Sequence, residues 1–483
     1  MSNYRPKYHI TPEKGWMNDI QRPIYIDGEH HLFYLHNKDF DWGGNGTEWG
    51  HVTSNDLVHW KRLPVAIPKY TDEAGDPWTG SAVVDVNNTA GFGEGAVISL
   101  VTMPKPNYQC THLWYSLDGG NNFIHYNPDP SSSTPQPVMY NPTGSSDFRD
   151  PKVIWHEETQ RWVMLMAEGD KIGFYISTNL KNWSYVSGFV RTDIGITECP
   201  DLFKINVDED PSKPKWVLMI GANGFNYGLT TGACYFVGNF DGQQFHPETD
   251  IQWLEYGADS YAGATWDAPY TEDNYRYYVS WMYNWAYAQD VPWDTYNGNA
   301  SIVREMRLKS LDGTYKIIQK PVWNLLSNFT PVSTLTNTTL YKDHALTWDN
   351  LTSYSVELTV SIDELTESKF GMALKDGLNH TDISYDPNTR EFVFNRLNSG
   401  EIINKPEFTD LQTVTVDSNN GKLKICILVD NSTIEIFIND GEYVLSNLIF
   451  PDETSNSLRI WSDGIINIDM IEVRKEDEPF IQN

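Results

Sequence analysis

The segment Gly50-His-Val-Thr-Ser-Asn-Asp-Leu-Val-His-Trp60 joins a short strand pattern, a turn containing Asn and Asp, and a closing aromatic residue. Similar segments follow at 113–123, 173–183 and 234–245, and a looser copy covers 304–315. The first four copies close at positions 60, 123, 183 and 245, which gives spacings of 63, 60 and 62 residues. A strand-rich repeat of this length is typical of a β-propeller, in which each copy belongs to one blade. Five copies predict five blades; the alternative is a large β-sandwich whose turns resemble one another by chance.

The repeat ends near Trp323, and the sequence that follows predicts a second, different domain. A stretch rich in Ser, Thr and Asn predicts a linker over 324–345. Beyond it, alternating strand-like runs and the hairpin signal Asp430-Asn-Ser are typical of an antiparallel β-sandwich. We therefore predict an all-β chain, with a five-bladed propeller that carries the catalytic site over 1–323 and a β-sandwich over 346–483.

The composition limits the partners that this protein can have. Its 483 residues include 35 basic and 65 acidic side chains, a formal net charge of −30. Such a surface repels phosphate backbones and anionic membranes, so we expect neither nucleic acid nor a membrane as a partner. No stretch approaches the ~18 apolar residues of a membrane-spanning helix. The opening residues Met1-Ser-Asn-Tyr-Arg-Pro lack an apolar signal region, so the protein either stays in the cytoplasm or has lost a leader; we favour secretion.

Cysteine spacing gives no sign of a disulfide scaffold or a zinc site. The four cysteines form no Cys-x-x-Cys pair and are far apart: Cys110, Cys199, Cys234 and Cys426. The acidic run Asp208-Glu-Asp210 has the character of a solvated loop rather than of a calcium site. We therefore expect no metal and no cofactor.

Three acidic segments from different copies of the repeat are the candidates for chemistry. They are Trp16-Met-Asn-Asp19, Phe148-Arg-Asp150-Pro and Thr197-Glu198-Cys-Pro-Asp201, and each adjoins a strand-like run. A single acid beside a strand is usually an exposed turn residue, but propeller geometry would bring these three together at the central axis. Clustered carboxylates suit cleavage of a glycosidic bond, which needs one ionised and one protonated acid. Tryptophans near these segments suit stacking against sugar rings.

The three acidic segments resemble the signature blocks of glycoside hydrolase family 32, which contains invertases, inulinases, levanases and fructosyltransferases. The similarity extends to Trp49-Gly-His51, Gly80-Ser-Ala-Val and Trp281-Met-Tyr-Asn-Trp285, and it covers nearly the whole chain. The family fold is a five-bladed propeller followed by a β-sandwich, which agrees with the repeat count.

The resemblance implies roles for individual residues. Asp19 would be the nucleophile that forms a covalent fructosyl intermediate, and Glu198 would be the general acid and then the general base. Asp150 would bind fructose hydroxyls and stabilise the transition state. The residues expected to contact substrate are Trp16, Asn18, Arg22, Leu35, Trp49, Trp78, Ser81, Arg149, Tyr261 and Trp285.

Two departures from the family pattern point to a subgroup. The family usually continues its first block as Asp-Pro-Asn-Gly, whereas this chain has Asp19-Ile-Gln-Arg22, and Leu35 stands where the family usually has Gln. Both forms resemble those of levan fructotransferases. Leu35 would make the site drier, and Arg22 would hold the next sugar unit.

The sequence thus predicts a retaining hydrolase that cleaves β-fructofuranosyl linkages in fructans, with levan favoured over inulin as substrate. One alternative is a levan fructotransferase that forms difructose anhydride by intramolecular transfer. The alternative from another class is a non-catalytic fructan-binding propeller, although a binder has no need of an acid/base pair.

Overall fold

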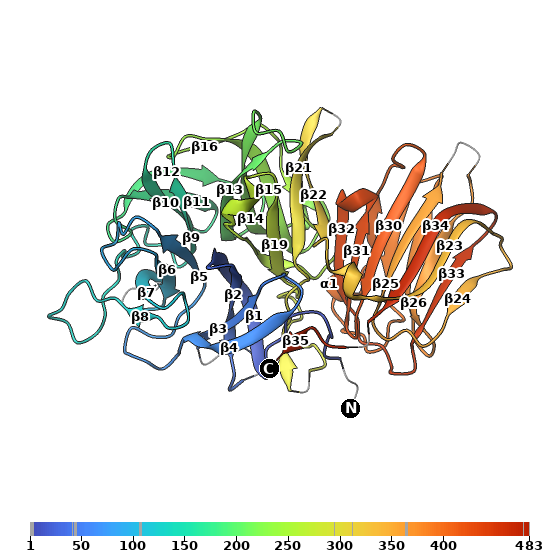
Figure 1. Cartoon of the computed structure of the whole chain (residues 1–483), viewed down its shortest axis with the longest axis horizontal. Helices are drawn as coiled ribbons and strands as arrows, with labels where there is room; N and C mark the ends of the chain where they lie inside the picture. Colours follow the sequence, from blue (N-terminus) through green and yellow to red (C-terminus); the bar gives the residue numbers. More distant parts are fainter. Residues whose placement is uncertain are drawn as a thin grey trace.

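The computed structural model describes residues 4–40, 42, 46–105, 109–293, 295–311, 313–362, 366–476 and 478–482. Within them the chain is almost entirely β-structure, and the one α-helix, α1, covers only Pro406–Thr409. Short 3-10 turns lie at Phe225–Tyr227, Pro269–Thr271, Leu326–Asn328 and Asn439–Gly441. Figure 1 shows a larger lobe built from the strands up to β22 and a smaller lobe built from β23 to β34. The prediction of an all-β fold with two domains of different architecture is confirmed.

The described strands of the larger lobe form five consecutive antiparallel units, and a parallel pairing of β1 with β5 joins the first two units into one sheet. The first unit contains β1 (Gly15–Ile26), β2 (Glu29–Asn37), β3 (Glu48–Ser54) and β4 (Trp60–Ile67). The second contains β5 (Gly80–Asp85), β6 (Ala96–Met103), β7 (Cys110–Ser116) and β8 (Ile124–His125). The third contains β9 (Arg149–His156), β10 (Arg161–Ala167), β11 (Lys171–Ser177) and β12 (Ser184–Val190).

The remaining two units complete the lobe. The fourth contains β13 (Glu198–Asn206), β14 (Pro214–Asn223), β15 (Thr231–Phe240) and β16 (Phe245–Pro247), with β17 (Gln252–Trp253) also paired to β15. The fifth contains β18 (Tyr261–Thr265), β19 (Arg276–Trp281), β21 (Arg304–Leu311) and β22 (Thr314–Pro321). The short β20 (Tyr296–Asn297) pairs with β1.

The first strands of the five units close into a ring. Each of β1, β5, β9, β13 and β18 contacts the next, and β18 contacts β1 again. Apolar side chains fill the space between neighbouring units: Phe33 and Trp49 of the first unit, for example, pack with Ala82 and Trp114 of the second. Similar clusters join the second to the third, the third to the fourth, the fourth to the fifth and the fifth to the first. This closed arrangement is that of a β-propeller.

The repeat in the sequence corresponds to one structural feature, the turn between the third and fourth strands of a unit. Segment 50–60 runs from within β3 to the first residue of β4, and 234–245 runs from within β15 to the first residue of β16. Segments 113–123 and 173–183 end one residue before β8 and β12. The outer hairpin thus carries the recurring pattern, while the inner strands differ.

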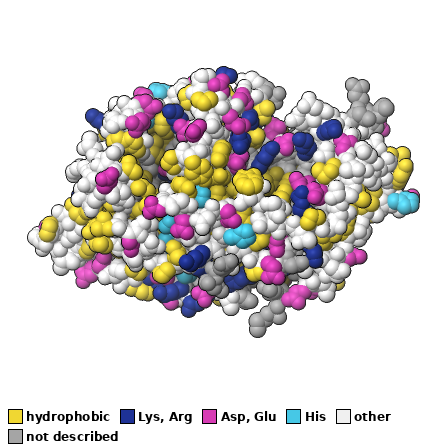
Figure 2. Space-filling view, viewed as in Figure 1, with side chains coloured by type: hydrophobic (Ala, Val, Ile, Leu, Met, Phe, Trp, Pro, Cys, Tyr) yellow, Lys and Arg dark blue, Asp and Glu magenta, His cyan; other side chains and the backbone are white. Residues whose placement is uncertain are grey.

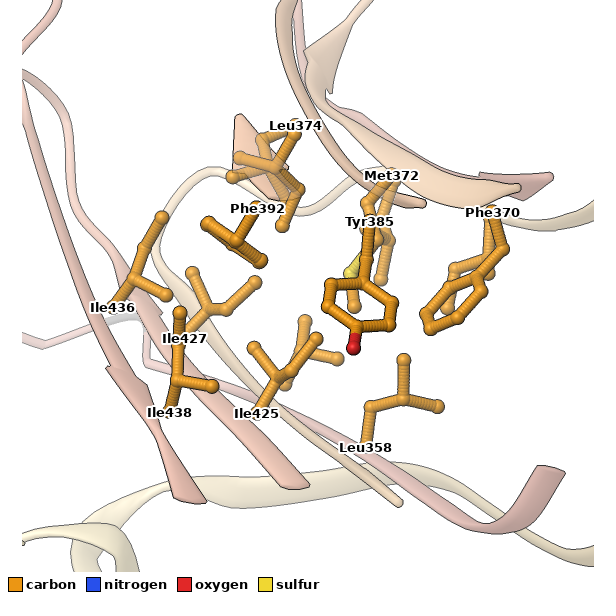
Figure 3. Packing of buried hydrophobic residues seen from close by; sticks show 14 of the residues in the cluster. Leu358, Phe370, Met372, Leu374, Tyr385, Phe392, Ile425, Ile427, Ile436 and Ile438 are labelled. Carbon is orange, nitrogen blue, oxygen red and sulfur yellow. The ribbon is translucent and has the colours of Figure 1, made fainter. Parts of the chain in front are cut away.

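The smaller lobe is a sandwich of two six-stranded sheets. One contains, in spatial order, β23 (Thr330–Leu340), β34 (Ile466–Lys475), β25 (Tyr354–Ser361), β30 (Lys422–Val429), β31 (Thr433–Ile438) and β32 (Tyr443–Leu448). The other contains β24 (Leu346–Trp348), β33 (Ser457–Ser462), β26 (Phe370–Asp376), β27 (Thr381–Asp386), β28 (Glu391–Asn395) and β29 (Gln412–Thr415). Alternate side chains of both sheets, such as Leu358 and Ile427 facing Met372 and Phe392, fill the core between them (Figure 3).

The domain boundaries differ from the predicted ones in two places. The predicted linker at 324–345 is wrong over Thr330–Leu340, because these residues form β23 and pair along their length with β34. The strand lies at the edge of its sheet with mostly exposed side chains, so its sequence is as polar as a linker. The predicted sandwich at 346–483 is also too long: Ile481–Gln482 form β35, which pairs in parallel with β4 of the propeller.

A buried ionic network joins the two lobes. Arg304 of the propeller forms ion pairs with Glu255 and with Glu435 of the sandwich, and none of these side chains is more than 2% exposed. His9 lies between Glu435 and Asp430, with its ring nitrogens 2.9 and 3.1 Å from their carboxylate oxygens. These pairs provide counter-charges inside the interface between the lobes.

Charged side chains of both signs lie on the face of the molecule shown in Figure 2. On the face shown in Figure 2, Asp and Glu side chains are scattered among Lys and Arg. Among the residues that the structure describes, no helix has the length and apolar character needed to cross a membrane.

Candidate active site

The three predicted carboxylates lie where inner strands begin and depart from regular pairing. The register of β1 against β2 shifts across Asp19, and the register of β13 against β14 shifts between Glu198 and Asp201. Asp150, the second residue of β9, has a left-handed φ of 61°. Such bulges and strained residues re-aim side chains and are common beside active sites. Because all three strands belong to the inner ring, their first residues meet at one mouth of the propeller axis.

Hydrogen bonds fix both oxygens of the half-buried Asp19. The Thr79 hydroxyl donates to Oδ2 at 2.6 Å, and the Asn18 amide donates to Oδ1 at 3.1 Å. Asn18 is itself oriented by the Trp16 indole, whose Nε1 donates to its carbonyl oxygen at 2.7 Å. These two hydrogen bonds hold the carboxylate in one orientation. This arrangement suits a nucleophile.

Glu198 has a different environment. Arg149 Nε donates to its Oε1 at 3.0 Å, and the Tyr261 hydroxyl donates to its Oε2 at 2.7 Å. Burial and the negative charge of Asp19 raise the pKa of Glu198 above its ordinary value, although Arg149 acts in the opposite direction. Since its side chain is still 27% exposed, Glu198 can exchange a proton with a bound molecule. A raised pKa and access to the mouth are the properties of a general acid.

Asp150 is the most buried of the three acids. It is 3% exposed, and its Oδ2 accepts a hydrogen bond of 2.9 Å from the backbone N–H of Cys199. Burial, followed by the charges of Glu198 and Asp19, raises the pKa of Asp150 to about 7. The three carboxylates therefore interact and cannot all be ionised at no cost.

Arg149 is the principal cation facing these acids. Besides Glu198, its guanidinium donates to Asp147 at 2.6 Å and to Gln109 at 3.2 Å. The side chain is 17% exposed and is thus held between the wall of the site and the mouth. In this position Arg149 can donate to a substrate hydroxyl as well as orient Glu198.

One group of side chains among the described residues has the spacing of a metal site. Single ligand atoms of Asp19, Asp150 and Cys199 lie within 4.8 Å of one another. Burial and the adjacent carboxylates raise the pKa of the Cys199 thiol well above its ordinary value. Asp19 and Asp150 of this group are also two of the predicted catalytic carboxylates, so the group lies within the candidate active site.

Two predicted substrate contacts, Trp16 and Trp285, belong to one aromatic cluster. Their ring centroids are 5.9 Å apart, and Trp281 lies 4.6 Å from Trp285. Trp16 is buried, whereas Trp285 is 43% exposed. Trp285 is therefore the aromatic side chain of this cluster that a sugar ring can reach.

Three other predicted contacts support the site from inside the propeller. Trp49 is fully buried and donates from its indole to the carbonyl of the half-buried Trp78 at 2.9 Å. Ser81 is also buried and accepts a hydrogen bond of 3.1 Å from the backbone of Val153 in the next unit. Trp49 and Ser81 are thus buried and hydrogen-bonded within and between the units, and their contact with substrate stays a prediction.

Leu35 and Arg22, two further predicted substrate contacts, are also buried. Leu35 is 5% exposed and packs in the apolar cluster between the first two units. Arg22 is 0% exposed, and its Nη2 donates to the carbonyl of Pro200 at 2.7 Å. Strand alternation at the bulged start of β1 turns this side chain toward the axis beneath the site.

Several residues that position the acids were not predicted. Thr79 directly precedes the Gly80 block, and Asp147 directly precedes Phe148, so proximity to the motifs could have indicated them. Thr102, which accepts from the backbone of Asp150, and Gln109 carry no local signal. They reach the site only because the ring brings the second unit against the third.

Two carboxylates in such unlike environments are what cleavage of a glycosidic bond requires, and the protein is accordingly a glycoside hydrolase. Comparison with known families agrees. Residues 9–321 match the N-terminal domain of glycosyl hydrolases family 32, and residues 325–475 match the C-terminal domain of the same family. The chain belongs to this family.

Individual relatives cover almost the whole chain. A levanbiose-producing levanase from Bacillus subtilis (strain 168) is 40% identical over 482 residues, which span 96% of this chain and 89% of the relative. An extracellular exo-inulinase from Aspergillus awamori is 33% identical, with 95% and 92% coverage. A crystal structure of exo-inulinase from Aspergillus awamori superposes with a TM-score of 0.89 at 30% identity and covers 99% of both chains.

Proposed function

We propose that the protein hydrolyses β-fructofuranosyl linkages in fructans, with levan as its preferred substrate. The observation that carries the proposal is the pairing of Asp19, which accepts a hydrogen bond at each carboxylate oxygen, with Glu198, whose pKa is raised. The choice of levan rests on the levanbiose-producing levanase, which is 40% identical over nearly the full chain.

In the proposed mechanism Asp19 attacks the anomeric carbon of a fructosyl unit while Glu198 gives its proton to the leaving oxygen. A water molecule then attacks the fructosyl–Asp19 ester, and Glu198 takes the proton of that water. The free Asp19 carboxylate and protonated Glu198 are restored, and the configuration of the sugar is retained. Tyr261 and Arg149, which donate to Glu198, orient it for both proton transfers.

Asp150 and Arg149 lie where they can bind hydroxyls of the reacting fructose. A protonated Asp150 can donate one hydrogen bond, and Arg149 can donate others as positive charge develops on the ring. Trp285 at the mouth would support the neighbouring sugar by stacking.

Hydrolysis, not intramolecular transfer, is the reaction that we propose. The argument for transfer used Leu35 to exclude water and Arg22 to hold the next sugar unit. Both side chains are buried, Leu35 in an apolar cluster and Arg22 against the Pro200 carbonyl, so their described contacts give that argument no support.

We also propose that the protein acts outside the cell, where polymeric fructans are found. The support is its similarity to the extracellular exo-inulinase. Detection of the native protein in the culture medium, free of a cytoplasmic marker, tests this point; retention with the marker would overturn it.

Product analysis tests the proposed reaction. The purified protein is incubated with levan, inulin or sucrose, and the sugars released are separated by chromatography, with Asp19→Asn as the inactive control. We expect reducing sugars from levan at a higher kcat/KM than from inulin or sucrose. Release from none of the three would overturn the proposal, faster release from inulin would overturn the levan preference, and a non-reducing product would indicate transfer.

A further inference from the structure

Arg22 is a charged side chain in an unusual place. It stands three residues after Asp19 on β1, opposite Ser81 in the parallel pairing of β1 with β5, and it is 0% exposed. Removing a guanidinium from water is costly unless its hydrogen bonds are replaced. The hydrogen bonds of the buried Arg22 guanidinium therefore indicate what this side chain stabilises.

The main contact of Arg22 crosses from the strand of the nucleophile to the strand of the acid. Its Nη2 donates to the Pro200 carbonyl at 2.7 Å. In β13, Glu198 pairs with Gly221 and Asp201 pairs with Met219, so the intervening residues have no partner in the ladder. A buried carbonyl on such a bulge needs a donor from elsewhere, and Arg22 supplies it.

The bulge held by Arg22 is the one that presents Glu198. Its central residue, Cys199, has a left-handed φ of 44°, which is strained for a residue other than glycine. The Cys199 N–H donates to Asp150 at 2.9 Å on one side, and the Pro200 carbonyl accepts from Arg22 on the other. These two hydrogen bonds keep the strained turn in place from opposite sides.

This contact depends on the particular first block of this chain. Arg22 occupies the position at which the resembling family pattern has glycine, and a glycine has no side chain to reach Pro200. The adjacent Gln21 has a related function: its amide donates to the Asp19 carbonyl at 2.9 Å, and its oxygen accepts from Gly80 at 2.7 Å. Gln21 thus connects the Asp19 backbone to β5, and Arg22 connects β1 to β13, the strand of Glu198.

We propose that Arg22 is a positioning residue that sets the orientation of Glu198 relative to Asp19 through the Pro200 carbonyl. The proposal rests on the function of Glu198 as the acid and base of a fructosidase. Proton transfer requires hydrogen-bond geometry, so loss of the hydrogen bond from Arg22 to Pro200 slows the steps in which Glu198 moves a proton. Ground-state binding, which uses other side chains, is largely preserved.

The test uses a series of aryl β-fructofuranosides whose leaving groups differ in pKa, together with levan. Arg22→Met removes the donors at similar volume, and Arg22→Lys retains one donor and the charge. The matched control is Lys152→Met, which removes another buried axial cation. Lys152 Nζ lies 3.3 Å from Asp201 and from Asp267, and the described contacts of its side chain do not include residues 198–200.

We expect Arg22→Met to lower kcat on levan and on poor leaving groups by about 100-fold, with KM within about threefold of wild type. On the best leaving group, which needs little protonation, the first step, measured as the burst of aryl release, slows by less than about tenfold. Arg22→Lys recovers part of the loss on poor leaving groups, whereas Lys152→Met affects all leaving groups equally.

Equal losses across the leaving-group series, or a loss confined to KM, would overturn the proposal. If Arg22→Met does not fold, Arg22→Lys must still show a smaller shift of the same kind, and its absence has the same consequence. Failure of the wild type on every fructan would overturn the fructan assignment alone, because the aryl series reports on Glu198 independently of the natural substrate.

Discussion

Buried carboxylates occur in two regions of this molecule, and their surroundings differ. At the interface between the lobes, hydrogen bonds and ion pairs to His9 and Arg304 outweigh burial and keep the pKa values of Asp430 and Glu435 below the ordinary range, although burial raises the pKa of Glu255 in the same network. At the mouth of the propeller, burial and mutual repulsion raise the pKa of Asp150 to about 7, and the pKa of Glu198 is also raised.

The opposite pKa shifts separate a structural function at the interface from a chemical function at the mouth of the propeller. An acid with a full counter-charge stays ionised and contributes to the cohesion of the two lobes. Acids that share too little positive charge retain protons near neutrality and can therefore give and take them. The same residue types thus have a structural function in one place and a chemical function in the other, and variants should separate the two.

The largest expected effect is that of Asp19→Asn. The amide cannot attack the anomeric carbon, so kcat on levan should fall by at least about 10⁴-fold. The melting temperature should stay close to that of wild type, because the change removes one charge from a region of repulsion. Steady-state kinetics and thermal unfolding measure both; activity within about tenfold of wild type would exclude Asp19 as the nucleophile.

Glu198→Gln should have the next largest effect. Without an acid, kcat on levan should fall by about 10²–10⁴-fold, and an activated aryl fructoside should lose much less in its first step. The comparison uses the rate on levan and the initial burst of aryl release, which reports the first step before ester hydrolysis limits turnover. Equal losses on both would mean that Glu198 has a structural or purely electrostatic function.

At the interface the effect should appear in stability and not in chemistry. Arg304→Met leaves Glu255 and Glu435 buried without their shared cation, and we expect a loss of about 3–5 kcal/mol in the free energy of unfolding. Chemical denaturation measures this loss. The kcat of the folded fraction should stay within about twofold of wild type.

The control for this variant is Arg390→Met, which breaks an exposed pair with Asp417 and should cost about 0–1 kcal/mol. Similar losses for the two arginine variants would contradict the structural function of the interface network.

A smaller effect concerns the pH dependence of stability. Burial alone would lower the pKa of His9, but its hydrogen bonds to Asp430 and Glu435 raise it from 6.5 to about 9. A base with a raised folded-state pKa stabilises fully below about pH 6.5, and this stabilisation is lost as the pH rises through about 9. Thermal unfolding across this range should show a decline that His9→Gln flattens.

Asp150→Asn provides the contrast from the other region. The folded-state pKa of Asp150 is raised from 3.8 to about 7, so the folded protein retains a proton that the unfolded chain releases. Its contribution to stability therefore declines as the pH rises from about 3.8 to about 7. Asp150→Asn should therefore make the free energy of unfolding less dependent on pH in this range. Identical pH profiles for His9→Gln and Asp150→Asn would contradict the separation of the two regions.

The smallest expected effect is at the rim of the site. Trp285→Ala removes the exposed ring that can stack on a neighbouring sugar, and KM for levan should rise about three- to tenfold with kcat little changed. Tyr270→Ala, which removes an exposed aromatic ring away from this cluster, serves as the control. An unchanged KM for Trp285→Ala would show that the rim does not hold the substrate.

The sequence predicted the architecture well because the outer hairpins repeat. Residues such as Trp60 and Phe245 occupy equivalent places in their units, so period and strand pattern together imply a closed ring. The edge strand Thr330–Leu340 was missed because an exposed strand is as polar as a linker. The two-residue strand Ile481–Gln482 has too short a pattern to detect.

For the site, the sequence indicated which acids come together but not how other residues support them. Asp19 and Glu198 lie in specific blocks, whereas the direction of Arg22 and Leu35 depends on bulges that shift strand alternation. Position near a motif therefore suggested substrate contact for side chains that are in fact buried. The contacts of Thr102 with Asp150 and of Gln109 with Arg149 depend on packing between units, which the sequence does not show.

The most direct test of the account is to trap the covalent intermediate. Glu198→Gln should form the fructosyl ester from an activated aryl fructoside but hydrolyse it slowly, since the base for the attacking water is missing. Intact-protein mass spectrometry followed by peptide mapping should then find one fructosyl unit on the peptide that contains Asp19. An adduct on Asp150 or another residue, or a product released with inverted anomeric configuration, would contradict the roles of Asp19 as nucleophile and Glu198 as acid and base.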